Sequence, residues 1–410
     1  MKFSSNRRKI ALAIPSVLFT KLTHASDFGK SLGYPAGWGP PGQKKMQTGW
    51  PDYLVGNFST GFEKLFDFKL VKAPSKPSPL LSRTQEFKLN LFQSLQDYQE
   101  QSGKPAILIA KRDCIYYEHY AFDRTAEMRF NGKSMAKSVV ALLAGVAFDM
   151  GLFNSLDDPI QKYDGRLKGK PLGAVTLRQA LNMSSGVDIC RSQCTPNNHY
   201  ERFERDSFAG APQSRAKNTD HDSVLINWSY GVDTQSNRYN YNPIDPQLIA
   251  MAIRGATKTT LSEFTQKALW EPIGARADAS WLVDSKGVEH APAGFNATLQ
   301  DWGRIGLLVA QSGSLSGNQI ISESWLNECK TFGASERRLM PGQIKDKPRG
   351  EGYKFFFHRP QDQSILRFGG DFSQSIFADT KNGLAVVILS ITNSGKDYER
   401  ILESAQTGLH

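Results

Sequence analysis

The clearest feature of the hydrophobic pattern is an apolar run over residues 138–147 that is rich in Ala and Leu. A run of this length and composition predicts a buried helix. The stretch before it reads Asn131-Gly132-Lys133-Ser134-Met135-Ala136-Lys137, so Ser134 is expected in the first turn of that helix. Ser134 and Lys137 therefore lie where the chain changes from polar to apolar.

Helical spacing of apolar residues predicts further helices at 84–101, 176–186, 246–254, 260–269, 298–311 and 396–407. Thr176 and Gly186 are expected to cap the second of these. Short apolar stretches bounded by turn residues predict strands at 105–110, 114–122, 352–358, 365–368, 374–379 and 384–391. Strands at both ends thus enclose a helical middle. This order predicts an α+β fold, in which one antiparallel sheet is flanked by helices and carries an all-helical insertion.

Composition indicates how the chain is organised. Its 410 residues are 40% hydrophobic and 11% aromatic, which suffices for a large core. Residues 26–83, rich in Gly, Pro and aromatic residues, predict an N-terminal arm packed on the main domain. That domain is expected to span 84–410, with a helical subdomain at about 151–290. The polar, irregular stretch 187–228 is expected to form a long loop over a site.

The first 25 residues have the pattern of a signal peptide. Residues 7–9 are basic, residues 10–19 form an apolar core, and Ala25 offers a small residue at a cleavage point. The apolar core is too short for a stable membrane span, and Pro15 interrupts it. We therefore predict a periplasmic or secreted protein with no stable membrane span after processing. An uncleaved N-terminus that anchors the protein to the membrane is the alternative.

Charge and cysteine content exclude several classes of function. The net charge of +10 does not indicate nucleic-acid binding, because Lys and Arg are spread along the chain and no nucleic-acid motif is present. Cys190 and Cys194 close a short loop and can pair in an oxidising compartment, with buried free thiols as the alternative. No Cys/His spacing is typical of a zinc site. We therefore predict no metal and no organic cofactor.

Ser134 and Lys137 form the first candidate for chemistry. They lie three positions apart, so on a helix their side chains share a face. A hydroxyl then lies beside an amine at the positive end of the helix dipole, where backbone N–H groups can bind an oxyanion. Ser-x-x-Lys is the nucleophile motif of penicillin-recognising serine enzymes. An N-cap serine followed by a solvated lysine is the alternative.

Two later stretches can supply the remaining groups. In Arg238-Tyr239-Asn240-Tyr241-Asn242-Pro243, the phenol of Tyr241 can face a pocket and act as a general base beside a lysine. The alternative is a half-buried tyrosine bonded to backbone. In Phe368-Gly369-Gly370-Asp371, the glycines let a ligand approach the main chain, and the N–H after them can complete an oxyanion hole with that of Ser134. A glycine bulge in an edge strand is the alternative.

These stretches together resemble a known family. Ser134-Met135-Ala136-Lys137, Tyr241-Asn242 and Phe368-Gly369-Gly370, in this order and spacing, resemble the three motifs of the beta-lactamase-related serine hydrolases. That family includes class C beta-lactamases, D-alanyl-D-alanine carboxypeptidases, family VIII esterases and 6-aminohexanoate-dimer hydrolases. Residues 281–284 and 294–302 look most like the last of these branches. The resemblance covers about residues 84–410 and implies a beta-lactamase/transpeptidase-like fold.

The resemblance also implies a role for each matching residue. Ser134 would be the acylated nucleophile, Lys137 its proton partner and Tyr241 the base. The main-chain N–H groups of Ser134 and Asp371 would form the oxyanion hole. The residues implied in substrate binding are Asn242, Phe368, Gly369 and Gly370.

The sequence departs from the family pattern at two positions. Pro243 stands where the second motif usually ends in Ser or Asn, and Asn242 is the neighbour that can partly substitute. Phe368 stands where the third motif often has Lys or His, a cation that would hold a substrate carboxylate. Its absence favours an ester or a neutral amide as the small-molecule substrate. We therefore predict a serine hydrolase acting on such bonds. The alternatives are a beta-lactamase or D-alanyl-D-alanine carboxypeptidase, and an inactive binding protein that retains the fold.

Overall fold

A computed structural model describes most of the chain beyond the first sixty residues. The described residues are 62–64, 66–84, 94–99, 102–122, 124–187, 220–229, 231–235, 239–331, 352–360, 362–390 and 398–409. The predicted signal peptide, residues 26–61 of the predicted arm and the Cys190–Cys194 pair lie outside them. Most of the predicted loop over 187–228 also lies outside them.

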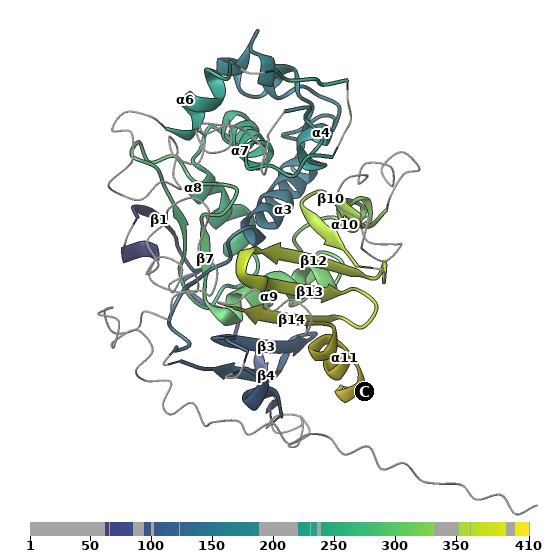
Figure 1. Ribbon diagram of the computed structural model, residues 1–410. Helices are drawn as coiled ribbons and strands as arrows, with labels where there is room; N and C mark the ends of the chain where they lie inside the picture. The colour runs from purple at the N-terminus through teal and green to yellow at the C-terminus, as the bar shows by residue number, and fades with distance from the viewer. Residues whose placement is uncertain are drawn as a thin grey trace, which may run out of the picture.

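The largest unit is an eight-stranded sheet in the order β10-β11-β12-β13-β14-β3-β4-β2. Its strands are β2 (Leu81–Ser82), β3 (Ala106–Lys111), β4 (Cys114–Tyr120), β10 (Gly352–Lys354), β11 (Phe357–Arg359), β12 (Ile365–Gly370), β13 (Gln374–Asp379) and β14 (Leu384–Leu389). Pairing is antiparallel throughout except between β2 and β4. β14 pairs with β3 from Leu384↔Lys111 to Leu389↔Ala106, so the two ends of the chain meet in the middle of the sheet (Figure 1). The predicted α+β class with antiparallel strands from both ends is therefore confirmed.

A second sheet of four strands was not apparent from the hydrophobic pattern. Its order is β1-β6-β7-β5, with β1 (Phe68–Val71), β5 (Phe130–Asn131), β6 (Ala279–Leu282) and β7 (Phe295–Ala297). β1 comes from the part of the predicted N-terminal arm that the structure describes, and it pairs with β6. A short helical turn, η3 (Phe62–Lys64), precedes β1. β5 leads directly into the turn that carries Ser134.

Apolar residues alternate between the two faces of the large sheet. Along β3, Leu108 and Ala110 belong to the main core, whereas Ile107 and Ile109 belong to a second, smaller core. Helix α9 (Leu299–Ala310) contributes to the main core, and α11 (Tyr398–Gly408) covers the other face. Both faces of the central strands are thus covered, which explains why these strands are apolar at nearly every position.

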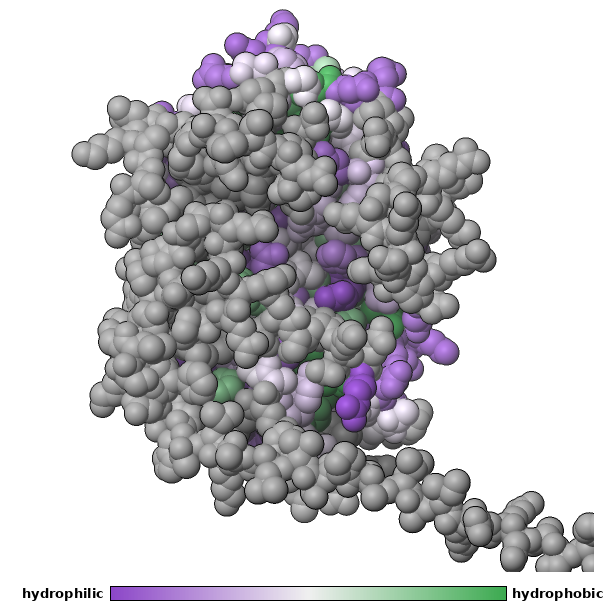
Figure 2. Space-filling model, viewed as in Figure 1, coloured by the Kyte–Doolittle hydropathy of each residue, from purple (hydrophilic) through white to green (hydrophobic). Residues whose placement is uncertain are grey.

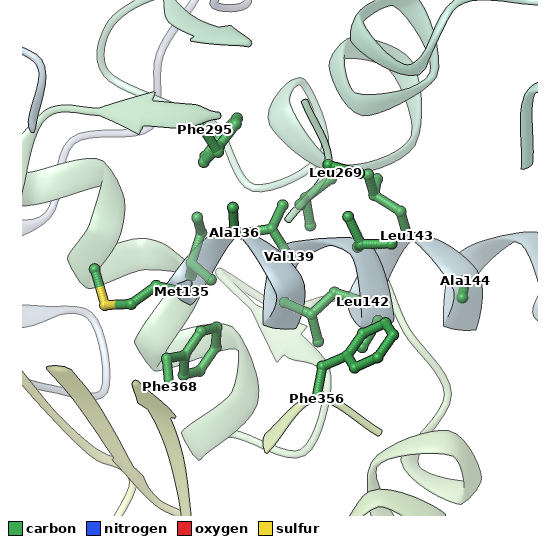
Figure 3. Packing of buried hydrophobic residues seen from close by; sticks show 14 of the residues in the cluster. Met135, Ala136, Val139, Leu142, Leu143, Ala144, Leu269, Phe295, Phe356 and Phe368 are labelled. Atoms are coloured by element: carbon green, nitrogen blue, oxygen red, sulfur yellow. The ribbon is translucent and has the colours of Figure 1, made fainter. Parts of the chain in front are cut away.

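Helix α3 (Met135–Asp149) lies between the large sheet and the helical region. Its residues from Met135 to Ala147 are all buried, and the apolar ones contact side chains on several sides (Figure 3). In Figure 3, Phe295 and Leu269 lie on one side of the helix, and Phe356 and Phe368 lie on the other. The predicted buried helix after Ser134 is confirmed.

Between β5 and β6 the described elements are all helical, as predicted for the insertion. They are α3, η5 (Ile160–Lys162), η6 (Gly165–Leu167), η7 (Pro171–Ala174), α4 (Leu177–Leu181), α6 (His221–Ile226), α7 (Ile244–Thr257), α8 (Leu261–Thr265) and the wider turn η9 (Gln266–Trp270). Helix α10 (Glu323–Lys330) and the hairpin β8 (Ser314–Leu315)–β9 (Asn318–Gln319) follow α9.

Three local predictions need correction. The helix that begins at Thr176 ends at Leu181, not at Gly186, because Met183 adopts a left-handed conformation with φ 54°. The stretch predicted as irregular contains α6, which Asp220 caps by accepting from Ser223 N. The strand predicted over 352–358 is two strands, since Phe355 and Phe356 both have positive φ and form a tight turn.

No described helix is both long enough and apolar enough to cross a membrane. In the view of Figure 2, the described surface at the helical end of the molecule is mostly hydrophilic, and apolar side chains show only in small areas.

Candidate active site

Ser134 occupies the N-cap position of α3, but its side chain does not cap the helix. Its side chain makes no capping hydrogen bond, so the hydroxyl is not committed to the helix backbone. Lys137, one turn along, is 4% exposed, and its Nζ lies 2.9 Å from Ser134 Oγ. The alternative of a capping serine beside a solvated lysine is therefore wrong, because neither side chain has that environment.

The Lys137 amino group contacts three other residues of the site, which are Ser134, Pro292 and Tyr241. It donates to the main-chain oxygen of Pro292 over 2.9 Å, as well as to Ser134 Oγ. It also lies 4.9 Å from the centroid of the Tyr241 ring. The three side chains proposed for catalysis thus come together, although more than a hundred residues separate Tyr241 from Ser134 in sequence.

Tyr241 lies half-buried just before helix α7, where aromatic neighbours orient its ring. It meets the Tyr353 ring edge to face, with centroids 5.6 Å apart. Tyr353 in turn contacts Tyr239 at 5.4 Å and His358 at 5.0 Å. This aromatic group connects the turn of the second motif to hairpin β10–β11, next to the third motif.

The third motif reaches Ser134 through Gly370, the last residue of β12. A Cβ on Gly370 would lie 2.4 Å from Gly132 O and 3.3 Å from Ser134 N, so the main chain there passes directly beside the nucleophile turn. Asp371 follows and is exposed, and Phe372 and Ser373 then have φ of 61° and 68°. Two consecutive left-handed residues that are not glycine mark a strained turn beside the site.

Phe368, for which a substrate-binding role is predicted, has its side chain in the core. Its side chain is fully buried and packs edge to face on Phe357 with centroids 5.0 Å apart, on the core side of the sheet (Figure 3). Gly369 has its neighbour on the adjacent strand: a Cβ there would lie 2.7 Å from the ring of His358. The residue beside the third motif that can interact through a polar ring is thus His358, which the sequence did not indicate.

The Asn242 side chain, for which a substrate-binding role is also predicted, forms hydrogen bonds with neighbouring main-chain groups. Its Oδ1 accepts from Ile244 N and Asp245 N, both at 2.9 Å, and its Nδ2 donates to Asn240 O at 2.8 Å. The residue is 1% exposed. Asn242 therefore stabilises the start of α7, and its role as a partial substitute at Pro243 stays a prediction. An Asn-Pro pair before an amphipathic helix is a capping signal that the sequence did contain.

Two buried groups near the site were also missed. Asp245, in the first turn of α7, is fully enclosed, and burial raises the pKa of its carboxyl to about 7 despite polar contacts with Ser185 and Asn242. His290 lies 3.3 Å from His221, ring nitrogen to ring nitrogen. Burial, followed by the nearby His221 and Lys137, holds the pKa of His290 well below its usual value, so this imidazole is neutral.

Comparison with known proteins gives the class of the molecule. The model of the family described as Beta-lactamase matches residues 93–406. The chain belongs to this family and is a hydrolase with the beta-lactamase fold.

Individual relatives are distant. The 6-aminohexanoate-dimer hydrolase of Paenarthrobacter ureafaciens is 20% identical over 296 residues, which are 72% of this chain and 74% of that protein. A candidate 6-aminohexanoate-dimer hydrolase of Bacillus anthracis has a TM-score of 0.71 at 19% identity, with 88% and 95% of the two chains covered. EstCE1, a hydrolase with promiscuous acyltransferase activity, has a TM-score of 0.61 at 15% identity, with 80% and 99% covered. At these identities the structural likeness establishes the fold.

Proposed function

We propose that the protein is a serine hydrolase that cleaves ester or small amide bonds through an acyl-enzyme on Ser134. The observation that carries the proposal is the 2.9 Å contact between Lys137 Nζ and Ser134 Oγ, made at a helix N-terminus beside the end of β12. A serine with no capping bond beside a buried lysine has little structural purpose, whereas a nucleophile needs such a neighbour.

In the proposed reaction, Ser134 Oγ forms a bond to the carbonyl carbon of the substrate, and its proton passes to Tyr241 or Lys137. The main-chain N–H groups of Ser134 and Asp371 stabilise the oxyanion. The bond to the leaving alcohol or amine then breaks, and that group takes the proton. Water adds to the acyl carbon in the second half and loses its proton to the same pair. The carbon–Oγ bond breaks, Ser134 regains a proton and a carboxylic acid is released.

The residues around the site favour a substrate without a charged group next to the bond that is cleaved. Phe368 offers no cation for a substrate carboxylate, and it is fully buried. Tyr241, whose ring lies 4.9 Å from Lys137 Nζ, belongs to an aromatic group with Tyr353 and Tyr239. The names of the Paenarthrobacter and Bacillus relatives support a small linear amide as one substrate class.

The test compares Ser134→Ala with wild type on p-nitrophenyl esters of short acids. We expect the variant to lose at least about a thousandfold in kcat, because nucleophile removal abolishes the covalent route. Ser285→Ala, which removes an exposed hydroxyl from a loop, is the matched control and keeps wild-type turnover. A fluorophosphonate probe is expected to label wild type at Ser134, as located by peptide mass spectrometry. Undiminished turnover by Ser134→Ala, or no labelling of folded wild type, contradicts the proposal.

Export remains part of the proposal, because the predicted signal peptide lies outside the described residues. We expect the mature protein in the periplasm or medium, beginning after Ala25. Cell fractionation with N-terminal sequencing checks this. An intact N-terminus in the membrane fraction would instead support the anchored alternative.

A further inference from the structure

Asn131, the last residue of β5, is 1% exposed and forms hydrogen bonds with the turn before Ser134, the loop of Ala293 and the start of β13. Its Oδ1 accepts from Lys133 N at 3.0 Å, which shapes the turn just before Ser134. Its Nδ2 donates to Ala293 O at 3.1 Å, next to the Pro292 carbonyl that holds Lys137. One side chain thus links the loop that holds the lysine to the turn that holds the nucleophile.

The main chain of Asn131 makes the third link. Its carbonyl accepts from Nε2 of Gln374 at 2.8 Å, and Gln374 is fully buried. Gln374 follows the strained turn of Asp371 to Ser373, whose first N–H is proposed for the oxyanion hole. Displacement of Asn131 would therefore move Ser134, Lys137 and the oxyanion turn relative to one another.

A line of buried hydrogen bonds continues from Asn131 to the N-terminal segment. Asn131 Nδ2 donates to Asn296 Oδ1 at 2.9 Å, and Asn296 Nδ2 donates to Ser280 Oγ at 2.9 Å. The Ser280 hydroxyl donates to the carboxylate of Glu63. We call Glu63, Ser280, Asn296 and Asn131 the relay. Asn131, Ser280 and Asn296 are at most 2% exposed, so water does not compete for these bonds.

Glu63 is itself fixed at the outer end of the relay. Arg129, on the approach to β5, donates to both of its carboxylate oxygens, at 2.7 and 2.6 Å. Next to it, the Phe62 ring lies 4.3 Å from Nζ of Lys133, the residue before Ser134. A two-pronged arginine pair gives a defined geometry as well as attraction. The segment before the hydrolase domain therefore touches the nucleophile turn twice, through the relay and through Phe62.

We propose that Glu63 and Asn131 are positioning residues. The segment 62–71 then fixes, through the relay, the position of the nucleophile turn relative to Lys137 and the oxyanion turn. This inference rests on the proposed function, since the position of the nucleophile turn affects a reaction rate only if Ser134 reacts. Ordering of the N-terminal segment would then set the rate of acylation. A chain that lacks the segment would keep its motifs and react slowly.

The experiment breaks the relay at its far end, where no substrate contact is involved. Glu63→Ala is expected to lower kcat on a p-nitrophenyl ester roughly 5- to 30-fold, with KM within about twofold, the size typical of coupling through a network. Glu63→Gln keeps an oxygen that accepts from Ser280 but loses the charge that Arg129 binds. We expect this variant to recover most of the kcat while its Tm stays low.

Lys72→Ala is the matched control. Lys72 directly follows this segment, and its ion pair of 2.9 Å with Asp278 takes no part in the hydrogen bonds of the relay. It should lower Tm at most slightly and leave kcat within about twofold, because exposed ion pairs contribute little to stability. Equal kcat values for Glu63→Ala and Lys72→Ala would overturn the proposal.

Two further readouts separate positioning from general destabilisation. Ser280→Ala should lower kcat as Glu63→Ala does, and the double variant should lose no more than either single one, because both changes cut the same line. Additive losses would contradict the relay. Hydrogen exchange of the peptide covering 130–134 should be faster in Glu63→Ala than in Lys72→Ala, and equal exchange would overturn the inference. This measurement needs no turnover, so it stands apart from any failure of the proposed function.

Discussion

The Lys137 amino group lies 4.9 Å from the centre of the Tyr241 ring, so the second motif packs against the first through a contact between an amino group and an aromatic ring. Lys137 reaches this position because it is buried at the start of α3 and bonded to the Pro292 carbonyl. Tyr241 is thus the residue of the second motif that contacts Lys137, which supports its proposed role as the base.

Tyr241→Phe should therefore lose most turnover. Removal of a general base typically costs about a hundred- to ten-thousandfold, and the ring that packs on Tyr353 is kept. Tyr239→Phe is the comparison, since Tyr239 packs on the same ring without contacting Lys137 in any bond described above. Steady-state kinetics on an ester measure both variants. If Tyr241→Phe turns over like Tyr239→Phe, the base has been misassigned.

Gly370→Ala should abolish activity by crowding the nucleophile turn. The new methyl group would lie 2.4 Å from Gly132 O, and backbone cannot move aside cheaply. We expect a loss of at least about a hundredfold in kcat, the scale of losing one oxyanion donor.

Gly369→Ala is the milder partner of that change, because its methyl group meets only the His358 ring, a side chain that can rotate. Its kcat should exceed that of Gly370→Ala. The reverse order would mean that β12 does not approach Ser134 as described.

Asn242→Ala tests whether the Asn242 side chain stabilises the start of α7. Loss of the two bonds to Ile244 N and Asp245 N should cost about 1 kcal/mol of unfolding free energy, typical of a helix cap. Chemical denaturation measures that loss. A substrate-binding role would instead raise KM with stability unchanged.

Because Phe368 stands where the third motif often has a cation, we expect poor reaction with penicillins. Phe368 itself supplies no cation for the penicillin carboxylate, so a fluorescent penicillin should label Ser134 more slowly than a fluorophosphonate does. Phe368→Ala should unfold more easily by about 3–5 kcal/mol, as large-to-small changes in cores do. Rapid and complete penicillin labelling of wild type would favour the beta-lactamase or carboxypeptidase alternative.

Asp245 predicts a pH dependence of stability. Its folded pKa of about 7 is above the unfolded value of 3.8, so the unfolded state loses its proton first. The residue therefore lowers stability as pH rises from about 4 to about 7, and the penalty is constant above that. Asp245→Asn should gain on wild type by a few kcal/mol between pH 4 and pH 8 in paired denaturation curves. A difference that does not change with pH would show that the carboxyl is not desolvated.

Local sequence signals were sufficient for the elements that carry the motifs. The apolar run after Lys137 gave α3, and Thr298 before an amphipathic stretch gave α9, because one face or one run was enough to define each helix. The small sheet could not be found this way, since β5 and β7 are two and three residues long and show no period. Their pairing depends on residues far apart in sequence.

The same limit applies to the site. Ser134, Lys137 and Tyr241 are recognisable by residue type and order, and the structure brings them together. The side-chain direction of Phe368 depends on which face of β12 meets the core, and a strand covered on both faces gives no alternation to read. The role of Asn131 could not be inferred either, because all its partners except Lys133 come from distant segments.

The pairing of β3 with β14 affects when the protein can fold during its synthesis on the ribosome. The large sheet next to α3 can form completely only after residues 384–389 have been synthesised and can pair with residues 106–111. Contacts of such long range slow folding, and the half-made chain exposes unpaired strand edges meanwhile. Synthesis of residues 384–389, rather than emergence of the turn that carries Ser134, therefore sets the moment at which this sheet can close.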